Sequence, residues 1–234
     1  MLRWELLGSV KMPGSGELLT LKRRGNEYTL DVDGSLLMTS LSHASEDSLA
    51  EITCRRIRAV RVPSVLVGGL GMGYTLAAAL KALGPQAKVA VCEISPGVVD
   101  WNRGPLSHLA GHPLKDRRVT VLTEDIALTL RRERAAYDAI LQDVDNGPEG
   151  QTLKANDWLY SEQGLAEAAA ALRPGGILAL WSAKPNKQFV KRLRRCGFEP
   201  EELCARGRDK HRGAHYIIWL AVLSSHSRSL DVER

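Results

Sequence analysis

Apolar and polar positions alternate over short stretches in the first part of the chain. Residues 17–23, 26–32 and 35–39 each show this alternation, and glycine-containing turns separate them, which predicts three short strands. Ser45 is placed to cap a following helix, because the next two residues are acidic and apolar residues then recur at helical spacing. We therefore expect a small β-element and one helix over residues 1–59.

The pattern changes at residue 60, where short apolar runs begin to alternate with amphipathic segments. The expected strands are 65–68, 87–92, 118–122, 137–141, 177–181, 199–204 and 215–223, and the expected helices are 74–83, 96–102, 126–134, 162–172 and 186–196. This alternation predicts a mostly parallel sheet with helices on both faces. The fold class is α/β: residues 60–234 form a Rossmann-like, doubly wound sheet of seven strands that ends in an antiparallel hairpin.

A glycine-rich turn follows the first of these strands and opens into an alanine-rich helix. Gly68, Gly69, Gly71 and Gly73 allow positive φ angles and a close approach of a ligand to the main chain. The helix N-terminus adds unpaired N–H groups and a partial positive charge. The spacing departs from the G-x-G-x-x-G dinucleotide fingerprint. Since open α/β sheets bind ligands at the carboxyl ends of their strands, we expect this turn to cradle a nucleoside.

Two acidic residues follow the next two strands. Glu93, with Ile94 after it, ends the second strand and is placed to accept hydrogen bonds from ribose hydroxyls. Asp125 and Ile126 end the third strand, where they could contact an adenine amino group and cover its face. Asp125 could equally cap the helix that follows, and both roles could hold together.

The fourth strand ends in a polar turn that contains two carboxylates, Asp143 and Asp145. A carboxylate at the end of a buried strand is costly without a partner or a function. Such a pair can orient an amine or hydroxyl nucleophile or remove its proton, so both are candidate catalytic residues. For Asp145, stabilisation of the turn is the alternative.

Composition limits the partners that we expect. The net charge is +5, but many basic residues lie in 187–195, read as one solvated face of a helix, and in 206–212, read as a loop. Nucleic acid is therefore not expected as the main partner, although an RNA-directed methyltransferase that uses the basic helix stays as a further hypothesis. Apolar runs are too short to span a membrane.

No signal-type segment opens the chain, so we expect a cytoplasmic protein. Four cysteines without C-x-x-C spacing are expected to be free thiols, and the scattered histidines predict no metal site.

Together, the glycine turn, Glu93, Asp125, Asp143 with Asn146-Gly147-Pro148, and Arg173-Pro174-Gly175-Gly176 resemble the class I S-adenosylmethionine-dependent methyltransferase fold. More closely, the chain looks like the spermidine synthase (polyamine aminopropyltransferase) family over nearly its whole length.

The resemblance implies a role for each matching position. The glycines wrap the donor, Glu93 holds its ribose, Asp125 and Ile126 hold adenine, and Asp143 deprotonates the attacking amine. His43, Glu46, Trp158 and Tyr160 are candidate acceptor-binding residues, and the N-terminal element covers the acceptor site or forms a homodimer contact.

One departure affects the expected reaction. The family carries an Asp inside the glycine turn that grips the amine of decarboxylated S-adenosylmethionine, and this chain has Gly71 there. We therefore expect S-adenosylmethionine, or a close analogue, as donor of an alkyl group to a small amine or hydroxyl acceptor, with methyl transfer slightly favoured. The alternatives are a true aminopropyltransferase and a non-catalytic protein that binds S-adenosylmethionine or methylthioadenosine.

Overall fold

The computed structural model describes residues 2–144, 154–206 and 215–224, and its N-terminal part is a four-stranded antiparallel sheet in the order β1-β2-β3-β4. The strands are β1 (Glu5–Lys11), β2 (Leu18–Arg24), β3 (Glu27–Val32) and β4 (Ser35–Thr39). The apolar pattern did not predict β1. Its alternation is interrupted near Gly8, where the pairing with β2 shifts register between Leu6 and Gly8.

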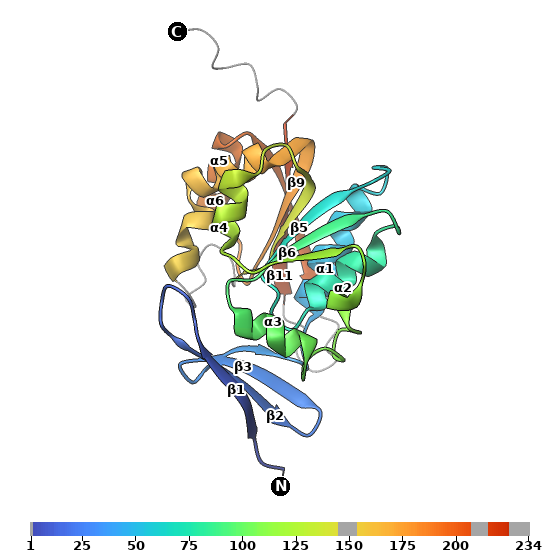
Figure 1. Cartoon of the computed structure of the whole chain (residues 1–234). Coiled ribbons are helices and arrows are strands. Elements are labelled where there is room, and N and C mark those ends of the chain that lie inside the picture. The colour runs from blue at the N-terminus through green and yellow to red at the C-terminus, as the bar shows by residue number, and fades with distance from the viewer. Residues whose placement is uncertain (1, 145–153, 207–214, 225–234) are drawn as a thin grey trace.

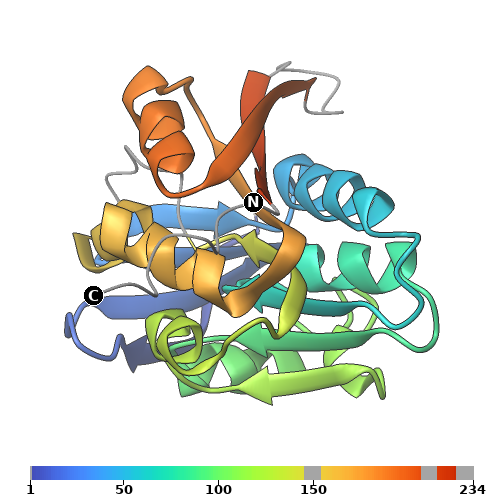
Figure 2. The same ribbon diagram turned by 90° about the horizontal axis from the view of Figure 1, so that it is seen from above.

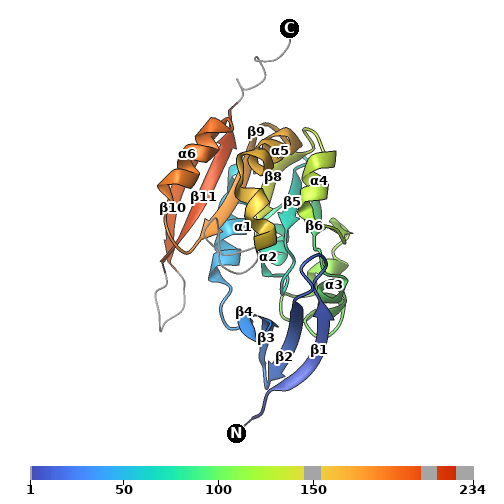
Figure 3. The ribbon, with the colours of Figure 1, turned by 90° about the vertical axis from the view of Figure 1, so that its left-hand side faces the viewer.

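One face of this N-terminal sheet is apolar and buried. Leu21, Leu30 and Met38 pair in a row across β2, β3 and β4, and Leu21 and Leu30 are fully buried. Figure 3 shows the sheet beneath one end of the larger α/β unit, next to helix α3 (Pro96–Arg103). The approach is close, because a Cβ on Gly8 would lie 2.8 Å from the indole nitrogen of Trp101.

The rest of the chain forms a seven-stranded sheet in the order β10-β11-β9-β8-β5-β6-β7. Its strands are β5 (Ser64–Gly68), β6 (Lys88–Cys92), β7 (Val119–Leu122), β8 (Tyr137–Gln142), β9 (Leu172–Ser182), β10 (Phe198–Arg206) and β11 (His215–Leu223). The five strands from β9 to β7 are parallel, and β10 and β11 form an antiparallel pair at one edge. The predicted fold class is confirmed.

Helices cover both faces of the large sheet, as Figures 1 and 2 show. Helix α1 packs on α2 and on β8 and β9, while α5 packs on α4, α6 and β9 on the opposite face. The remaining elements are α1 (Ala44–Arg56), α2 (Tyr74–Ala82), α4 (Ile126–Arg132), α5 (Glu162–Ala171), α6 (Lys187–Arg195) and the 3-10 turns η1 (Pro113–Lys115) and η2 (Lys154–Tyr160). Within the described ranges, no helix combines the length and the apolar character that crossing a bilayer needs.

Two local predictions were wrong. His43, not Ser45, occupies the N-cap position of α1, and the Ser45 hydroxyl donates to the Glu46 carboxylate instead. The Arg-Pro-Gly-Gly stretch after α5 is not a loop, because β9 begins at Leu172 and includes it. The pairing with β8 shifts register here, because Leu172 pairs with Tyr137 and Ile177 pairs with Ala139. The stretch is therefore an irregularity within β9, which turn-forming composition did not indicate.

Helix α1 connects the two sheets. The domain boundary at residue 59 assigns it to the N-terminal element, whereas its packing partners are α2 and the large sheet. The boundary itself stays a prediction.

Candidate functional site

A cavity of about 350 Å³ lies where the N-terminal sheet meets the carboxyl ends of β5, β6, β7 and β8. This is the edge at which parallel α/β sheets bind ligands. Eight of the candidate site residues line the cavity: Glu46, Gly69, Gly71, Glu93, Ile94, Asp125, Ile126 and Asp143. The fold therefore brings together residues that are far apart in the sequence.

The glycine turn between β5 and α2 requires glycine at specific positions. Gly69, Gly71 and Gly73 have φ angles of 86°, 51° and 86°, in the left-handed region that favours glycine. A Cβ on Gly69 would collide with the carbonyl oxygen of Asp143, so no side chain fits between the two strand ends. Asn102 on α3 donates a 2.8 Å hydrogen bond to the Gly71 carbonyl. The turn is thus held rigidly against its neighbours.

Gly68 and Gly73 shape the turn without lining the cavity. Gly68 ends β5, and a Cβ there would collide with the side chain of Ile126. Gly73 occupies the N-cap position of α2. Their absent side chains let the start of α4 and the N-terminus of α2 lie close to the cavity.

Glu93 fastens the end of β6 to the glycine turn. Its buried carboxylate accepts hydrogen bonds from the Leu70 N–H at 3.0 Å and the Ser95 N–H at 2.9 Å. Burial raises its pKa, and the backbone donors oppose that rise. Glu93 also lines the cavity, which places its carboxylate where a ligand hydroxyl can approach it. The ribose role stays a prediction.

Asp125 caps α4, which is one of the two roles predicted for it. Its carboxylate accepts a 2.9 Å hydrogen bond from the Ala127 N–H, and the residue also lines the cavity. The two roles are compatible, because one carboxylate oxygen can serve the helix while the other faces a ligand.

We expect Asp125→Ala to lower the free energy of unfolding by about 1 kcal/mol through loss of the cap. Asp125→Asn keeps a capping oxygen and should stay within a few tenths of a kcal/mol, to be checked by denaturant unfolding. Ser161→Ala is the matched control for the loss of a helix cap, because Ser161 caps α5 and does not line the cavity. Equal stability of the alanine and asparagine variants at Asp125 would contradict the capping role.

Asp143 follows β8 and is half-buried at the cavity. Its carboxylate accepts hydrogen bonds from the Thr75 hydroxyl on α2 and, at 2.9 Å, from the Trp181 indole N–H on β9. Burial and then the charge of Glu46 raise the pKa of Asp143 to about 7, against the two donors, which lower it. A carboxyl with a pKa near neutral pH is suited to accept and release a proton.

Glu46 on α1 is the second acid on this side of the cavity. It is buried, and burial is the main cause of its raised pKa. The Ser45 hydroxyl donates to it at 2.5 Å. Since Glu46 and Asp143 share one cavity and each is hard to ionise, we call them the acidic pair.

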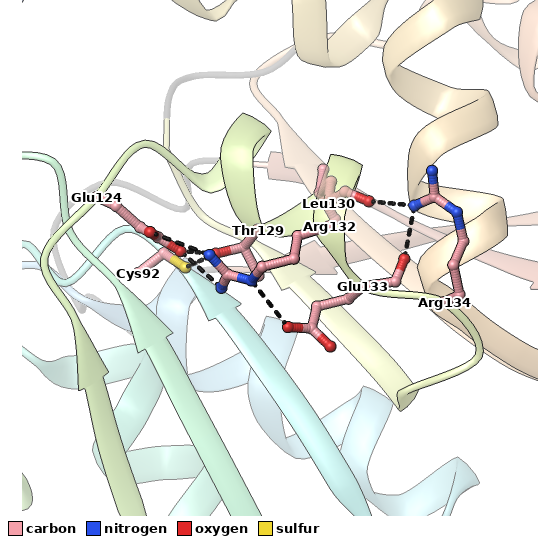
Figure 4. Close-up of polar contacts among 7 residues, drawn as sticks. All are labelled: Cys92, Glu124, Thr129, Leu130, Arg132, Glu133 and Arg134. Atoms are coloured by element: carbon pink, nitrogen blue, oxygen red, sulfur yellow. Dashed lines mark hydrogen bonds and ion pairs between the residues drawn. The ribbon is translucent and has the colours of Figure 1, made fainter.

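Glu124 also lines the cavity, and the sequence analysis did not single it out. Figure 4 shows its carboxylate between Arg132, at 2.9 Å, and the Thr129 hydroxyl, at 2.5 Å. These donors lower its pKa. The sequence contained a signal for this ion pair, because Arg132 lies on the helix that begins two residues after Glu124. The network fixes the loop after β7, which carries Asp125.

Three of the four candidate acceptor residues lie outside the cavity lining. The His43 ring stacks on Tyr74 with centroids 4.1 Å apart, and Trp158 packs under the Arg131 guanidinium. Tyr160 is buried against Phe189, so its ring is part of the core. Asp145, the second candidate catalytic acid, lies outside the described residues. The acceptor roles stay predictions.

Carboxylates dominate the charge of the cavity. Of the described residues that line it, five are acidic and none is Lys, Arg or His; the acids are Glu46, Glu93, Glu124, Asp125 and Asp143. The described ranges contain no cluster of three or more His, Cys, Asp or Glu arranged to hold a metal ion. Such a lining suits an organic cation.

Comparisons with known proteins place the chain in a family. The spermine/spermidine synthase domain model matches residues 57–193, more than half of the chain. Curated relatives from Mycobacterium tuberculosis and Mycobacterium bovis, each called polyamine aminopropyltransferase, are 29% identical over 170 residues. The match covers 71% of this chain and 31% of each relative, so the chain spans about a third of their length.

Solved structures with the same fold include two spermidine synthases. One, from Thermotoga maritima, has a TM-score of 0.72 at 18% identity over 93% of this chain and 72% of its own. The other, in complex with the transition state analogue AdoDATO, has a TM-score of 0.70 at 17% identity over 92% of this chain and 72% of its own. On the evidence of the matching domain, this chain belongs to the spermine/spermidine synthase family.

Proposed function

We propose that the chain is an aminopropyltransferase whose cavity binds decarboxylated S-adenosylmethionine and an amine acceptor. The observation that carries this proposal is the lining, with five acids and no basic side chain among its described residues. S-Adenosylmethionine itself carries a carboxylate that these acids would repel, whereas the decarboxylated donor is a pure cation. The family supports the same choice, so methyl transfer, which Gly71 had favoured, becomes the second candidate.

The cavity offers a site for each part of such a donor. The glycine turn provides exposed main chain and the N-terminus of α2, and Glu93 lies beside it for the ribose. Gly68 has no side chain, and Ile126 fills the space beside it. Ile126 thereby forms an apolar surface for a flat base. The residues therefore fit an adenosyl sulfonium.

The donor supplies a carbon made electrophilic by its sulfonium. The acceptor nitrogen forms a bond to that carbon, the carbon–sulfur bond breaks with its electron pair going to sulfur, and methylthioadenosine leaves. Asp143 takes the proton that the acceptor nitrogen loses. Thr75 and Trp181 hold the Asp143 carboxylate in place while it does so. Orientation and one proton acceptor are sufficient protein contributions for this displacement.

The test is incubation with either donor and a set of amines, followed by chromatography of the nucleoside product. We expect methylthioadenosine from the decarboxylated donor and no adenosylhomocysteine from S-adenosylmethionine. The reverse result would establish methyl transfer. Release of neither nucleoside would favour a non-catalytic binding protein. A homodimer and a cytoplasmic location stay predictions.

Methyl transfer keeps one specific observation in its favour. The Cβ position of Gly71 lies 3.1 Å from the sulfur of Met38 on β4, so Met38 occupies the space beside the turn where the family's Asp would project. No side-chain carboxylate in the turn is therefore available for a donor amine.

A further inference from the structure

The cavity has two sides of opposite chemistry. The strand ends of the large sheet carry four of the acids, and Glu46 comes from α1. The N-terminal sheet and the residue after β1 contribute an apolar wall, which consists of Met12, Leu19, Leu30, Leu36, Leu37 and Met38. In the part of this sheet that lines the cavity, Thr39 is the one polar side chain among the described residues.

The acids of the N-terminal sheet are engaged by the chain itself. Asp31 follows Leu30 on β3 and pairs across the strands with Leu36 of the apolar wall. Asp31 is paired with Lys22 at 3.2 Å, and Asp33 accepts a hydrogen bond from the Leu18 N–H at 2.9 Å. Neither acid lines the cavity. Within the described part of the chain, the apolar wall thus offers no unengaged carboxylate.

The other acids of the cavity leave one place for an acceptor amine. Glu124 is paired with Arg132, and Glu93 and Asp125 are the acids expected to contact the ribose and adenine of the donor. The acidic pair remains, and its members come from α1 and the end of β8, beside the apolar wall. Because Glu46 and Asp143 act on each other, they suit one shared amine better than two ammonium groups far apart.

We propose that the acceptor is a monoamine with an apolar chain, bound with its nitrogen at the acidic pair and its chain along the apolar wall. The proposal rests on the function proposed above and specifies its acceptor. A linear polyamine would place a second ammonium group against the apolar wall, where it loses hydration without gaining a partner. An alkyl chain gives up no hydrogen bonds to water there, and its removal from water is favourable.

The first test compares two amines with the same number of non-hydrogen atoms. Cadaverine differs from n-hexylamine in that an ammonium group replaces the terminal methyl group. Each is titrated by calorimetry into the protein saturated with methylthioadenosine. We expect n-hexylamine to bind about tenfold more tightly or better, from the desolvation of the second ammonium group.

The second test places a carboxylate on the apolar wall. Leu36 lines the cavity and is 61% exposed, so Leu36→Glu should fold. Leu41→Glu is the matched control, because Leu41 is 64% exposed and does not line the cavity. We expect Leu36→Glu to narrow or reverse the preference for n-hexylamine, and Leu41→Glu to leave it unchanged.

The outcomes separate the two proposals. Cadaverine binding as tightly as n-hexylamine, or failure of both amines to bind, overturns the monoamine acceptor. An equal effect of both glutamate variants also overturns it, because the effect would then be general surface charge. If n-hexylamine binds preferentially but no amine yields methylthioadenosine from the decarboxylated donor, the acceptor site stands and the transferase function fails.

Discussion

Asp143→Asn is expected to lower kcat on the order of 10²–10⁴-fold, because it removes the proposed proton acceptor while keeping the shape of the side chain. Affinity for methylthioadenosine should stay close to that of the unchanged protein, since the proposed function places the nucleoside at the glycine turn and Glu93. Steady-state kinetics and calorimetry measure the two quantities separately. Asp100→Asn is the control, because Asp100 is an exposed acid on α3. An unchanged rate in Asp143→Asn would remove this residue from the mechanism.

The pH dependence of the reaction rate tests the role of Asp143 independently. Asp143 accepts a proton only when ionised, and its pKa is raised to about 7. We therefore expect kcat/KM of the unchanged protein, which reports ionisations of the free enzyme, to rise with pH through about 7. Thr75→Val removes a donor that stabilises the charged carboxylate, so the rise should move to higher pH. A merely structural role of Thr75 would lower activity without this shift.

Restoring a carboxylate in the glycine turn is expected to change the choice of donor. Gly71→Asp should tighten binding of decarboxylated S-adenosylmethionine relative to S-adenosylmethionine by roughly 10- to 100-fold, from a charge-assisted hydrogen bond of about 1.5–3 kcal/mol. The φ of 51° at Gly71 is one that Asp adopts more readily than most residues. The new Cβ lies 3.1 Å from the Met38 sulfur, so Met38→Ala is combined with it to make room.

The control for this change is Gly71→Asn combined with Met38→Ala, which has the same shape without the charge. Calorimetry with both donors compares the two double variants. If Asp and Asn give the same ratio of affinities, the donor amine does not reach the turn. Met38→Ala alone should leave that ratio unchanged, because it adds space and no charge.

Much of the α/β unit followed from local pattern. Apolar runs, glycine and proline placement and helical spacing predicted all seven strands of the large sheet and its helices within a few residues. The same pattern missed β1, whose alternation is broken near Gly8, and misplaced the start of β9. Both failures concern stretches where the pairing with the neighbouring strand shifts register, which local alternation does not record.

The amino-acid sequence by itself determined that Gly71, Glu93, Asp125 and Asp143 would share one end of a parallel sheet, since the carboxyl ends of parallel strands meet at one edge. Only the tertiary structure decided which groups face them across the cavity. Met38 lies against Gly71, and Glu46 raises the pKa of Asp143, because α1 and the N-terminal sheet pack over that edge. Periodicity records which face of an element is buried, and it does not record which element covers that face.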